Sequence, residues 1–312
     1  MKIQRQRQHT LAWIAVLMLA TPAFAEDSVR IHVLGVAQDA GYPQAGCYQA
    51  HCMPGWEDRN KRITASAIAV VDSAAGSKLL FEATPNISDQ LYRLHRVAPD
   101  GEYTLDGVFV THAHIGHYAG LLFFGHEVMG AQEVPVFAMP RMREFLSSNG
   151  PWDQLVRFGN IALQPLQDGS PVAFDRVTVT PFRVPHRDEY SETVGYRIEG
   201  PNKTAVFIPD IDKWQDWETD IRDVVRGVDY ALLDATFYAD GELPGRDMSE
   251  IRHPFISESM LLFETLTQEE KSRVIFIHMN HTNPALVKNS EARKAIEGSG
   301  FRVAFEGMQL EL

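Results

Sequence analysis

The amino-acid sequence predicts an α/β fold whose helices and sheets are stacked in layers. Apolar, β-branched segments alternate with helical segments along the chain, without internal repeats or low-complexity tracts. The chain has two strand-rich halves of similar helix content, which favours a layered sandwich over a doubly wound parallel sheet. With 312 residues, of which 45% are hydrophobic and 22% charged, the composition is that of a globular protein.

The predicted elements follow one another without a long break. Strands are predicted where β-branched and aliphatic residues cluster, over 29–36, 65–71, 78–82, 107–111, 177–184, 193–198, 204–208, 230–233 and 273–277. A helix is predicted from Pro85 to Leu94, and further helices over 141–148, 219–226, 257–264 and 290–298. No Pro-, Gly- or Ser-rich linker divides the chain, so we predict one domain over residues 26–312.

The first 25 residues have the pattern of a secretory signal peptide. A positively charged start containing Lys2 is followed by an apolar run over 11–20 and by a small-x-small cleavage site, Ala23-Phe24-Ala25. A helix of that length is too short to cross ~30 Å of hydrocarbon, although an uncleaved membrane anchor is the alternative interpretation. We therefore expect residues 1–25 to be removed and the mature protein to be periplasmic or secreted, without stable membrane association.

The charge of the chain bears on its partners. The formal net charge is −12, which argues against binding to nucleic-acid backbones or anionic membranes through the overall field. We expect a small-molecule substrate and no nucleic acid. These patterns assign no oligomeric state.

A cluster of histidines follows the short apolar strand over 107–111. His112 and His114 point the same way if the backbone stays extended, and His117 can fold back towards them if a helix starts there. Such a turn presents several imidazoles to one cation, as a catalytic zinc with an open position requires. Three unrelated surface histidines are the alternative, but this spacing is rare by chance.

On these residues the chain resembles the metallo-β-lactamase superfamily. His112, His114 and His117 match the histidines of the family motif H-x-H-x-D-H. The further matches each follow a predicted strand, as the αββα sandwich of the family requires: His186, Asp210 and His278. More narrowly, the segments Val184-Pro185-His186-Arg187 and Thr282-Asn283-Pro284 resemble the branch that contains pyrroloquinoline quinone biosynthesis protein B. Phosphodiesterases and tRNA 3′-processing enzymes are nearby relatives.

The resemblance implies one or two bound zinc ions, with iron as an alternative. The first metal would be held by His112, His114, His186 and Asp210, and the second by His117, Asp210 and His278. The family has an aspartate where this chain has Gly116, so the second site lacks one charged ligand. We therefore expect a mononuclear centre or a weakly held second ion, and expect Gly116→Asp to raise the occupancy of the second site.

The implied function is an exported zinc-dependent hydrolase that uses a metal-bound hydroxide on an ester, phosphodiester or lactam bond. Asp210 would help to hold the water, and Asp234 with His253 resembles a carboxylate–histidine pair that protonates a leaving group in the tRNA-processing branch. Both residues could instead be merely structural. Two other functions stay open: an iron-dependent oxidative enzyme of the quinone-cofactor branch, and a non-catalytic metal- or cofactor-binding protein of the same fold.

The two cysteines of the chain lie on one loop, and two interpretations of them stay open. In an oxidising compartment, Cys47 and Cys52 would form a disulfide that closes a small loop. Several relatives instead bind a structural zinc with a cysteine loop and a late histidine. By that resemblance, Cys47, Cys52, His281 and His51 could ligate one zinc ion, since thiolate and imidazole suit tetrahedral zinc.

Overall fold

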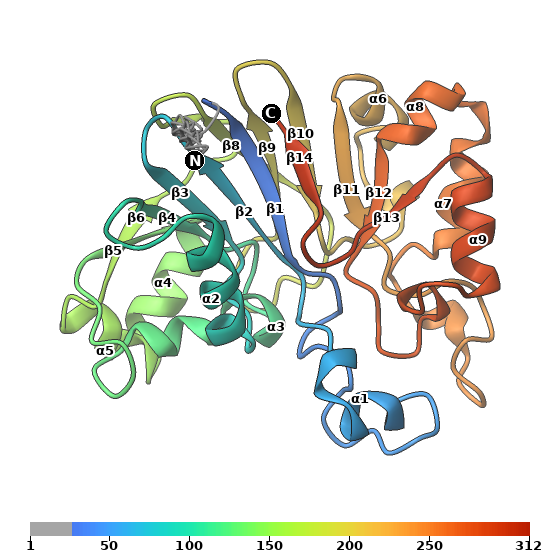
Figure 1. Cartoon of the computed structure of the whole chain (residues 1–312), viewed down its shortest axis with the longest axis horizontal. Coiled ribbons are helices and arrows are strands. Elements are labelled where there is room, and N and C mark those ends of the chain that lie inside the picture. Colours follow the sequence, from blue (N-terminus) through green and yellow to red (C-terminus); the bar gives the residue numbers. More distant parts are fainter. Residues whose placement is uncertain (1–26) are drawn as a thin grey trace, which may run out of the picture.

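Two seven-stranded β-sheets pack face to face between layers of helices in the computed structural model, which describes residues 27–312 (Figure 1). The predicted layered α/β sandwich is confirmed. The predicted signal peptide, residues 1–25, lies outside the described residues.

The two sheets divide the chain almost into halves. In order across the first sheet, the strands are β14 (Gln309–Glu311), β1 (Val29–Gly35), β2 (Ala67–Asp72), β3 (Ser77–Phe81), β4 (Thr104–Phe109), β5 (Val134–Ala138) and β6 (Ile161–Pro165). Across the second sheet they are β13 (Arg302–Val303), β12 (Val274–Ile277), β11 (Tyr230–Asp234), β10 (Thr204–Ile208), β9 (Val194–Glu199), β8 (Thr178–Arg183) and β7 (Val172–Ala173). Only β14 returns to the other half, where it pairs antiparallel with β1.

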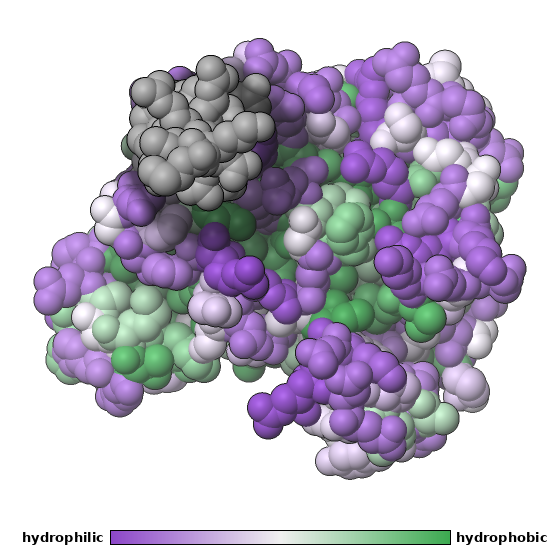
Figure 2. All heavy atoms as spheres, in the orientation of Figure 1, coloured by the Kyte–Doolittle hydropathy of each residue, from purple (hydrophilic) through white to green (hydrophobic). Residues whose placement is uncertain are grey.

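The helices lie on the outer faces of the sheets, as Figure 1 shows. Helices α2 (Ile87–Val97), α3 (Ile115–Tyr118), α4 (Pro140–Ser148) and α5 (Trp152–Arg157) belong to the first half. Helices α6 (Ile221–Arg226), α7 (Ile256–Leu262), α8 (Gln268–Arg273) and α9 (Glu291–Gly298) belong to the second, and α1 (Met53–Glu57) protrudes beyond the edge of the sheets. On the face that Figure 2 shows, hydrophilic side chains predominate around α7 and α9.

Helix α2 illustrates how these layers form. Its buried residues are Ile87, Gln90 and Leu94, a spacing that places them on one face of an α-helix. That face packs over the first sheet, while Asp89 and Arg93 lie on the more exposed side. Burial of the apolar stripe stabilises the helix by roughly 25 cal/mol per Å² of apolar surface removed from water.

An aromatic stack joins the two sheets at the centre of the molecule. Phe81 and Phe109 stack with ring centroids 4.9 Å apart, and Tyr196 of the second sheet meets Phe81 edge-on at 5.4 Å. The Tyr196 hydroxyl donates a 2.5 Å hydrogen bond to the carbonyl of Val110. This bond holds the end of β4, and hence the histidine loop that follows, against the second sheet.

Several elements differ from the sequence-based expectation, among them the unpredicted helices α1, α5 and α8. Strands β5 and β6 were not expected because Pro135, Gln164 and Pro165 interrupt their apolar pattern; β5 forms by pairing with β4, and β6 by pairing with β5. The helix that the sequence analysis allows near His117 is the short helix α3, which a 3₁₀ helix, Ala119–Phe124, follows. Within residues 27–312, no helix combines the length and the apolar character needed to cross a membrane.

A buried ion pair links the end of β2 to the second sheet. Asp72 is almost fully buried, and the Nε of Arg176 lies 3.0 Å and 3.1 Å from its two carboxylate oxygens. Burial opposes ionisation of Asp72, but Arg176 and the backbone N–H groups of Ala74 and Ala75 outweigh it and lower the carboxyl pKa. A lowered folded-state pKa means that this pair stabilises the protein above about pH 4 and loses its effect as the pH falls.

We predict that Arg176→Met lowers the free energy of unfolding by about 1–2 kcal/mol at pH 7, because a buried carboxylate loses its charged partner. The difference between variant and wild type should shrink as the pH falls through the pKa of Asp72. Urea unfolding at several pH values measures the loss of stability at pH 7 and its dependence on pH. Lys294→Met, which removes the exposed pair with Glu291, is the matched control and should leave stability nearly unchanged. A pH-independent difference would contradict the assignment.

Candidate metal centre

The predicted ligands follow strands that end at one edge of the sandwich. In the first sheet β3, β4 and β5 are parallel, and in the second β10, β11 and β12 are parallel. Strand β8 runs in the same direction as β10 because both are antiparallel to β9. Loops at the carboxyl ends of these strands therefore meet, and they carry His112, His114 and His117 after β4, His186 after β8, Asp210 after β10 and His278 after β12.

Four side chains, those of His112, His114, His186 and Asp210, form the first cluster. His114 Nδ1 lies 2.8 Å from His112 Nε2 and 3.2 Å from His186 Nε2. Asp210 Oδ2 lies 3.3 Å from His186 Nε2 and 3.4 Å from His112 Nε2. Burial lowers the pKa of His112 well below its usual value and keeps this imidazole neutral.

These spacings fit a single tetrahedral ion. Donor atoms bound to one tetrahedral metal at ~2.0–2.1 Å lie about 3.4 Å from one another. Three of the separations, 3.2, 3.3 and 3.4 Å, are close to this value, and the 2.8 Å between His114 Nδ1 and His112 Nε2 is shorter. The structure therefore brings together the four residues that the sequence predicts as ligands of the first metal.

His117 and His278 form a second cluster, beside the first. His117 Nε2 lies 3.6 Å from Asp210 Oδ2, so Asp210 stands between the two clusters. His278 Nε2 and His117 Nε2 are buried without a hydrogen-bond partner among the described residues. Buried polar atoms are nearly always hydrogen-bonded, so two such nitrogens side by side suit a cation. Burial lowers the pKa of His278 well below its usual value, which leaves the imidazole neutral.

The second cluster contains a carboxylate that the sequence interpretation missed. Asp39 offers a ligand atom within 4.8 Å of those of His117 and His278. Strand β1 is antiparallel to β2, which is antiparallel to β3, so β1 also ends at the edge where the ligands meet. The signal was therefore present: Asp39 follows a predicted strand, as the predicted ligands do, but the sequence interpretation gave it no role.

Each ligating histidine has an oxygen near its second ring nitrogen. The pairs are His112 Nδ1 with Thr111 Oγ1 at 2.9 Å, His114 Nε2 with Glu189 at 3.1 Å, His186 Nδ1 with Asp212 at 3.1 Å, His117 Nδ1 with Glu82 at 3.4 Å, and His278 Nδ1 with Thr236 Oγ1 at 3.1 Å. Partners of this kind fix the orientation and tautomer of a metal-binding imidazole. The sequence could not identify them because they come from separate loops and strands.

Carboxylates raise the pKa of two of the ligating histidines. Burial alone would lower the pKa of His117, but the charge of Glu82 outweighs it and raises the pKa to about 9. For His186, the charges of Asp210 and Asp212 outweigh burial and raise the pKa to about 10. Binding of a metal must displace these protons, so metal binding releases protons and strengthens as the pH rises.

Asp234 and His253 form a pair beside the clusters. Asp234 is fully buried at the end of β11, and its Oδ2 lies 2.9 Å from His253 Nδ1. His253 Nδ1 also lies 3.1 Å from Asp210 Oδ1. Burial opposes protonation of His253, but the charges of Asp210 and Asp234 raise its pKa. The structure thus brings the predicted carboxylate–histidine pair together and connects it to the clusters through Asp210.

A cavity of about 510 Å³ opens beside these groups. His186, His253 and Asp39 contribute to its wall, so both clusters and the carboxylate–histidine pair are within reach of a small molecule. Three arginines also line the cavity: Arg187, Arg246 and Arg252. Arg252 is paired with Asp212 at 2.7 Å. The carboxylates of Asp39, Asp212 and Glu250 line the same cavity, so the arginines do not give its wall a net positive charge.

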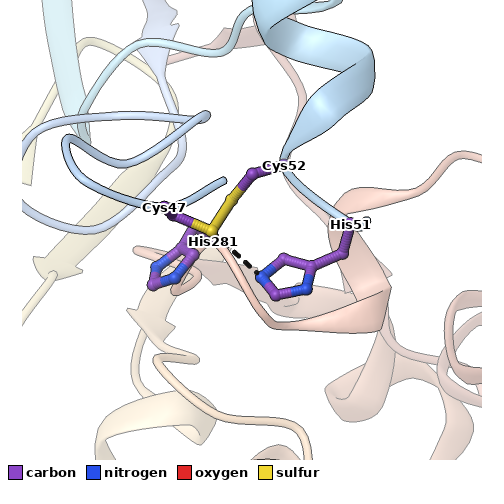
Figure 3. A group of neighbouring side chains, drawn as sticks. All are labelled: Cys47, His51, Cys52 and His281. Carbon is purple, nitrogen blue, oxygen red and sulfur yellow. Dashed lines mark hydrogen bonds between the residues drawn. A yellow bond between two sulfur atoms is a disulfide. The ribbon is translucent and has the colours of Figure 1, made fainter. Parts of the chain in front are cut away.

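The cysteine loop forms a separate group of side chains, shown in Figure 3. Cys47 and Cys52 are joined by a disulfide, and His51 Nε2 lies 3.5 Å from Cys47 Sγ. His281 approaches from the loop after β12, with its ring centroid 5.6 Å from that of His51. The four side chains expected to form either a disulfide or a zinc site are thus together, in the disulfide form. The two forms exclude each other because zinc binds the free thiolates.

Comparisons with known proteins agree with this geometry. The sequence profile of the beta-lactamase superfamily domain matches residues 77–279, well over half of the chain. Coenzyme PQQ synthesis protein B of Methylobacterium sp. (strain 4-46) is 30% identical over 306 aligned positions, which cover 90% of this chain and 99% of that protein. The chain belongs to the metallo-β-lactamase superfamily. The resemblance to the coenzyme PQQ synthesis branch is also confirmed by a protein of the same name from Xanthomonas campestris pv. campestris (strain B100), 26% identical over 309 positions covering 91% of this chain and all of that protein.

Two solved structures of the superfamily show the same fold. The Zn²⁺-bound PqqB from Methylobacterium extorquens aligns with a TM-score of 0.74 and 23% identity, over 91% of this chain and 100% of that one. A diphosphatase from the PhnP family aligns with a TM-score of 0.63 and 21% identity, over 91% and 97% of the two chains. The fold is thus shared by proteins of different activity, and the αββα prediction is confirmed.

The disulfide and zinc interpretations of the cysteine loop differ in metal content. We predict that replacing both cysteines, Cys47→Ser with Cys52→Ser, leaves the metal content unchanged. It should lower the free energy of unfolding by about 2 kcal/mol, because the closed loop is short. Elemental analysis and thermal unfolding measure these effects. His51→Ala, which keeps the disulfide, is the control. If both variants lose one metal equivalent, the disulfide interpretation is wrong and the loop forms a Cys/His metal site.

Proposed function

We propose that this protein is an exported metal-dependent hydrolase whose two histidine clusters hold zinc. The observation that carries the proposal is the nearly tetrahedral spacing of His112, His114, His186 and Asp210 beside a cavity. His117 and His278 form the second position. A zinc ion held at the first position would lower the pKa of a bound water to about 7 and would supply a Lewis acid for a substrate oxygen. The Zn²⁺-bound PqqB of similar fold supports the choice of zinc.

The residues of the chain then have distinct tasks. Asp210 Oδ2 faces both clusters and Oδ1 faces His253. Its charge therefore attracts both the metal-binding histidines and the proton-donating histidine. Asp234 accepts from His253 Nδ1 and keeps that ring oriented at the cavity wall. With its raised pKa, His253 holds a proton that it gives to the oxygen of the leaving group.

Two arginines at the cavity wall, Arg187 and Arg246, support a small anionic substrate. We propose a phosphodiester in preference to a neutral ester, with a lactam carrying a carboxylate as the next choice. Arg246 and Arg187 provide cationic groups at the wall, and within the described residues Arg246 forms no ion pair of its own. A nucleic acid is disfavoured by the net charge of −12.

Export to the periplasm or beyond is part of the same proposal. It rests on the signal-peptide pattern over residues 1–25 and is supported by the disulfide, since disulfides persist in oxidising compartments. Removal of that segment would leave a protein without a stable membrane attachment.

The kinship with coenzyme PQQ synthesis protein B favours a second function. Proteins of that name are similar over 90% or more of the chain, so a role in cofactor synthesis, with iron at the same histidines, is the alternative. Imidazole and carboxylate ligands accept either zinc or iron, so the ligands alone do not decide between the two functions. The identity of the bound metal separates them.

The proposal is tested with protein purified without chelators from the periplasm. We expect one to two zinc ions per chain and turnover of bis(p-nitrophenyl) phosphate above that of p-nitrophenyl acetate and a chromogenic cephalosporin. His114→Ala should abolish turnover and lower the zinc content, while circular dichroism shows an intact fold. Equal turnover by His114→Ala would overturn the site. Iron without hydrolysis would favour the alternative function, and absence of bound metal would favour a non-catalytic protein.

Proton donation by His253 depends on the leaving group. We predict that His253→Ala slows cleavage of a phosphodiester with an alkyl leaving group by 10²–10⁴-fold, because such an oxygen needs a proton. Cleavage of bis(p-nitrophenyl) phosphate should change far less, since p-nitrophenolate leaves unaided. His95→Ala, at a half-exposed histidine outside the clusters, is the control. Equal losses on both substrates would assign His253 a positioning task instead.

A further inference from the structure

Gly116 and Asp39 compete for the same space. A Cβ atom built on Gly116 would lie 2.4 Å from the Cα of Asp39 and 2.7 Å from its Oδ1. Real Cβ atoms do not approach other atoms this closely, and the nearest contact is backbone. No residue with a side chain fits at position 116 while Asp39 keeps its place.

The backbone holds Asp39 beside the second cluster. The N–H of Gln38 donates to the carbonyl of Met279 at 2.8 Å, and the N–H of Met279 donates to the carbonyl of Val36 at 2.9 Å. This pairing fixes the loop after β1 next to His278, the residue before Met279. Asp39 has a φ of 49° and His278 a φ of 66°, in the left-handed region that residues other than glycine rarely adopt. Such strain persists where the surrounding structure requires it and gathers at functional sites.

The side chain of Asp39 is directed to the two unpartnered nitrogens. Its Oδ1 lies 3.9 Å from His117 Nε2, and its ligand atom lies within 4.8 Å of that of His278. Among the described residues, no Lys or Arg forms an ion pair with Asp39. The side chain is about half exposed and lines the cavity, so an ion from solvent can reach it. A carboxylate beside two neutral or displaceable imidazoles is a donor set suited to zinc.

We propose that Asp39 is a carboxylate ligand of the second metal ion. It occupies the space of the aspartate that the family motif has at the position of Gly116. The second ion would be held by Asp39, His117, His278 and the shared Asp210. This inference rests on the proposed metal centre and adds to it a ligand from a different loop, 77 residues before Gly116 in the chain. The second site is then as rich in ligands as the first.

The inference corrects one expectation from the sequence. Gly116→Asp was expected to raise the occupancy of the second site by restoring a missing ligand. Because its Cβ would overlap Asp39, the variant should instead displace Asp39 and weaken the second site. Removing the side chain of Asp39 would not relieve this overlap, because the shortest contact, at 2.4 Å, is with the backbone Cα of Asp39.

The experiment measures zinc binding rather than turnover. Full-length protein is stripped of metal and titrated with zinc against a chromogenic chelator, so that each ion gives its own dissociation constant. The variants are Asp39→Asn, Asp39→Gly and Gly116→Asp. Glycine suits the positive φ at position 39, so Asp39→Gly removes the carboxylate without adding backbone strain. Asp106→Asn, at a half-buried aspartate of β4 outside the clusters, is the matched control.

We expect wild type and Asp106→Asn to bind two zinc ions. Asp39→Asn, Asp39→Gly and Gly116→Asp should weaken only the second by more than about 100-fold, since losing an outer partner of a ligand already costs 10–100-fold. Unchanged binding of both ions in Asp39→Asn, or a single zinc in wild type at saturation, would overturn the inference and leave the first site standing. A wild type that binds no zinc would overturn the proposed function as well.

Discussion

Asp210 is the side chain on which the whole centre depends. Its Oδ2 lies between 3.3 and 3.6 Å from nitrogens of His112, His117 and His186, and its Oδ1 is near His253. A fully buried carboxylate is costly unless charge compensates it. Burial opposes its ionisation, but the charges of His186 and His253 outweigh burial and hold its pKa well below the usual value. The surrounding imidazoles therefore keep it an anion, and that anion draws the loops of both sheets to one point.

Much of this arrangement could be predicted from the sequence because it obeys a simple geometric rule. Parallel strands deliver the residues that follow them to one edge, so His112, His186, Asp210 and His278 could be grouped without coordinates. The family pattern strengthened that grouping. The end of β4 was recognised because residues 107–111 are continuously apolar, whereas β5 and β6 were missed because prolines break their pattern.

What the sequence could not supply is contact between loops distant in the chain. Glu82 and Asp212 support histidines 35 and 26 residues away, and no motif relates them. Asp39 was missed for the same reason, since a motif describes neighbours along the chain and not in space. The glycine at position 116 appeared as a lost ligand, and only the position of Asp39 against it explains why a glycine stands there.

The ligands come from both halves of the sandwich. His112, His114 and His117 follow a strand of the first sheet, and His186, Asp210 and His278 follow strands of the second. The bond from Tyr196 to Val110 already fastens the sheets near this edge. Any ion held by both sets therefore acts as a cross-link between the halves, and separating the halves costs the binding free energy of that ion. Through this linkage the supply of metal in its compartment would govern how long the chain stays folded, independently of any reaction that it performs.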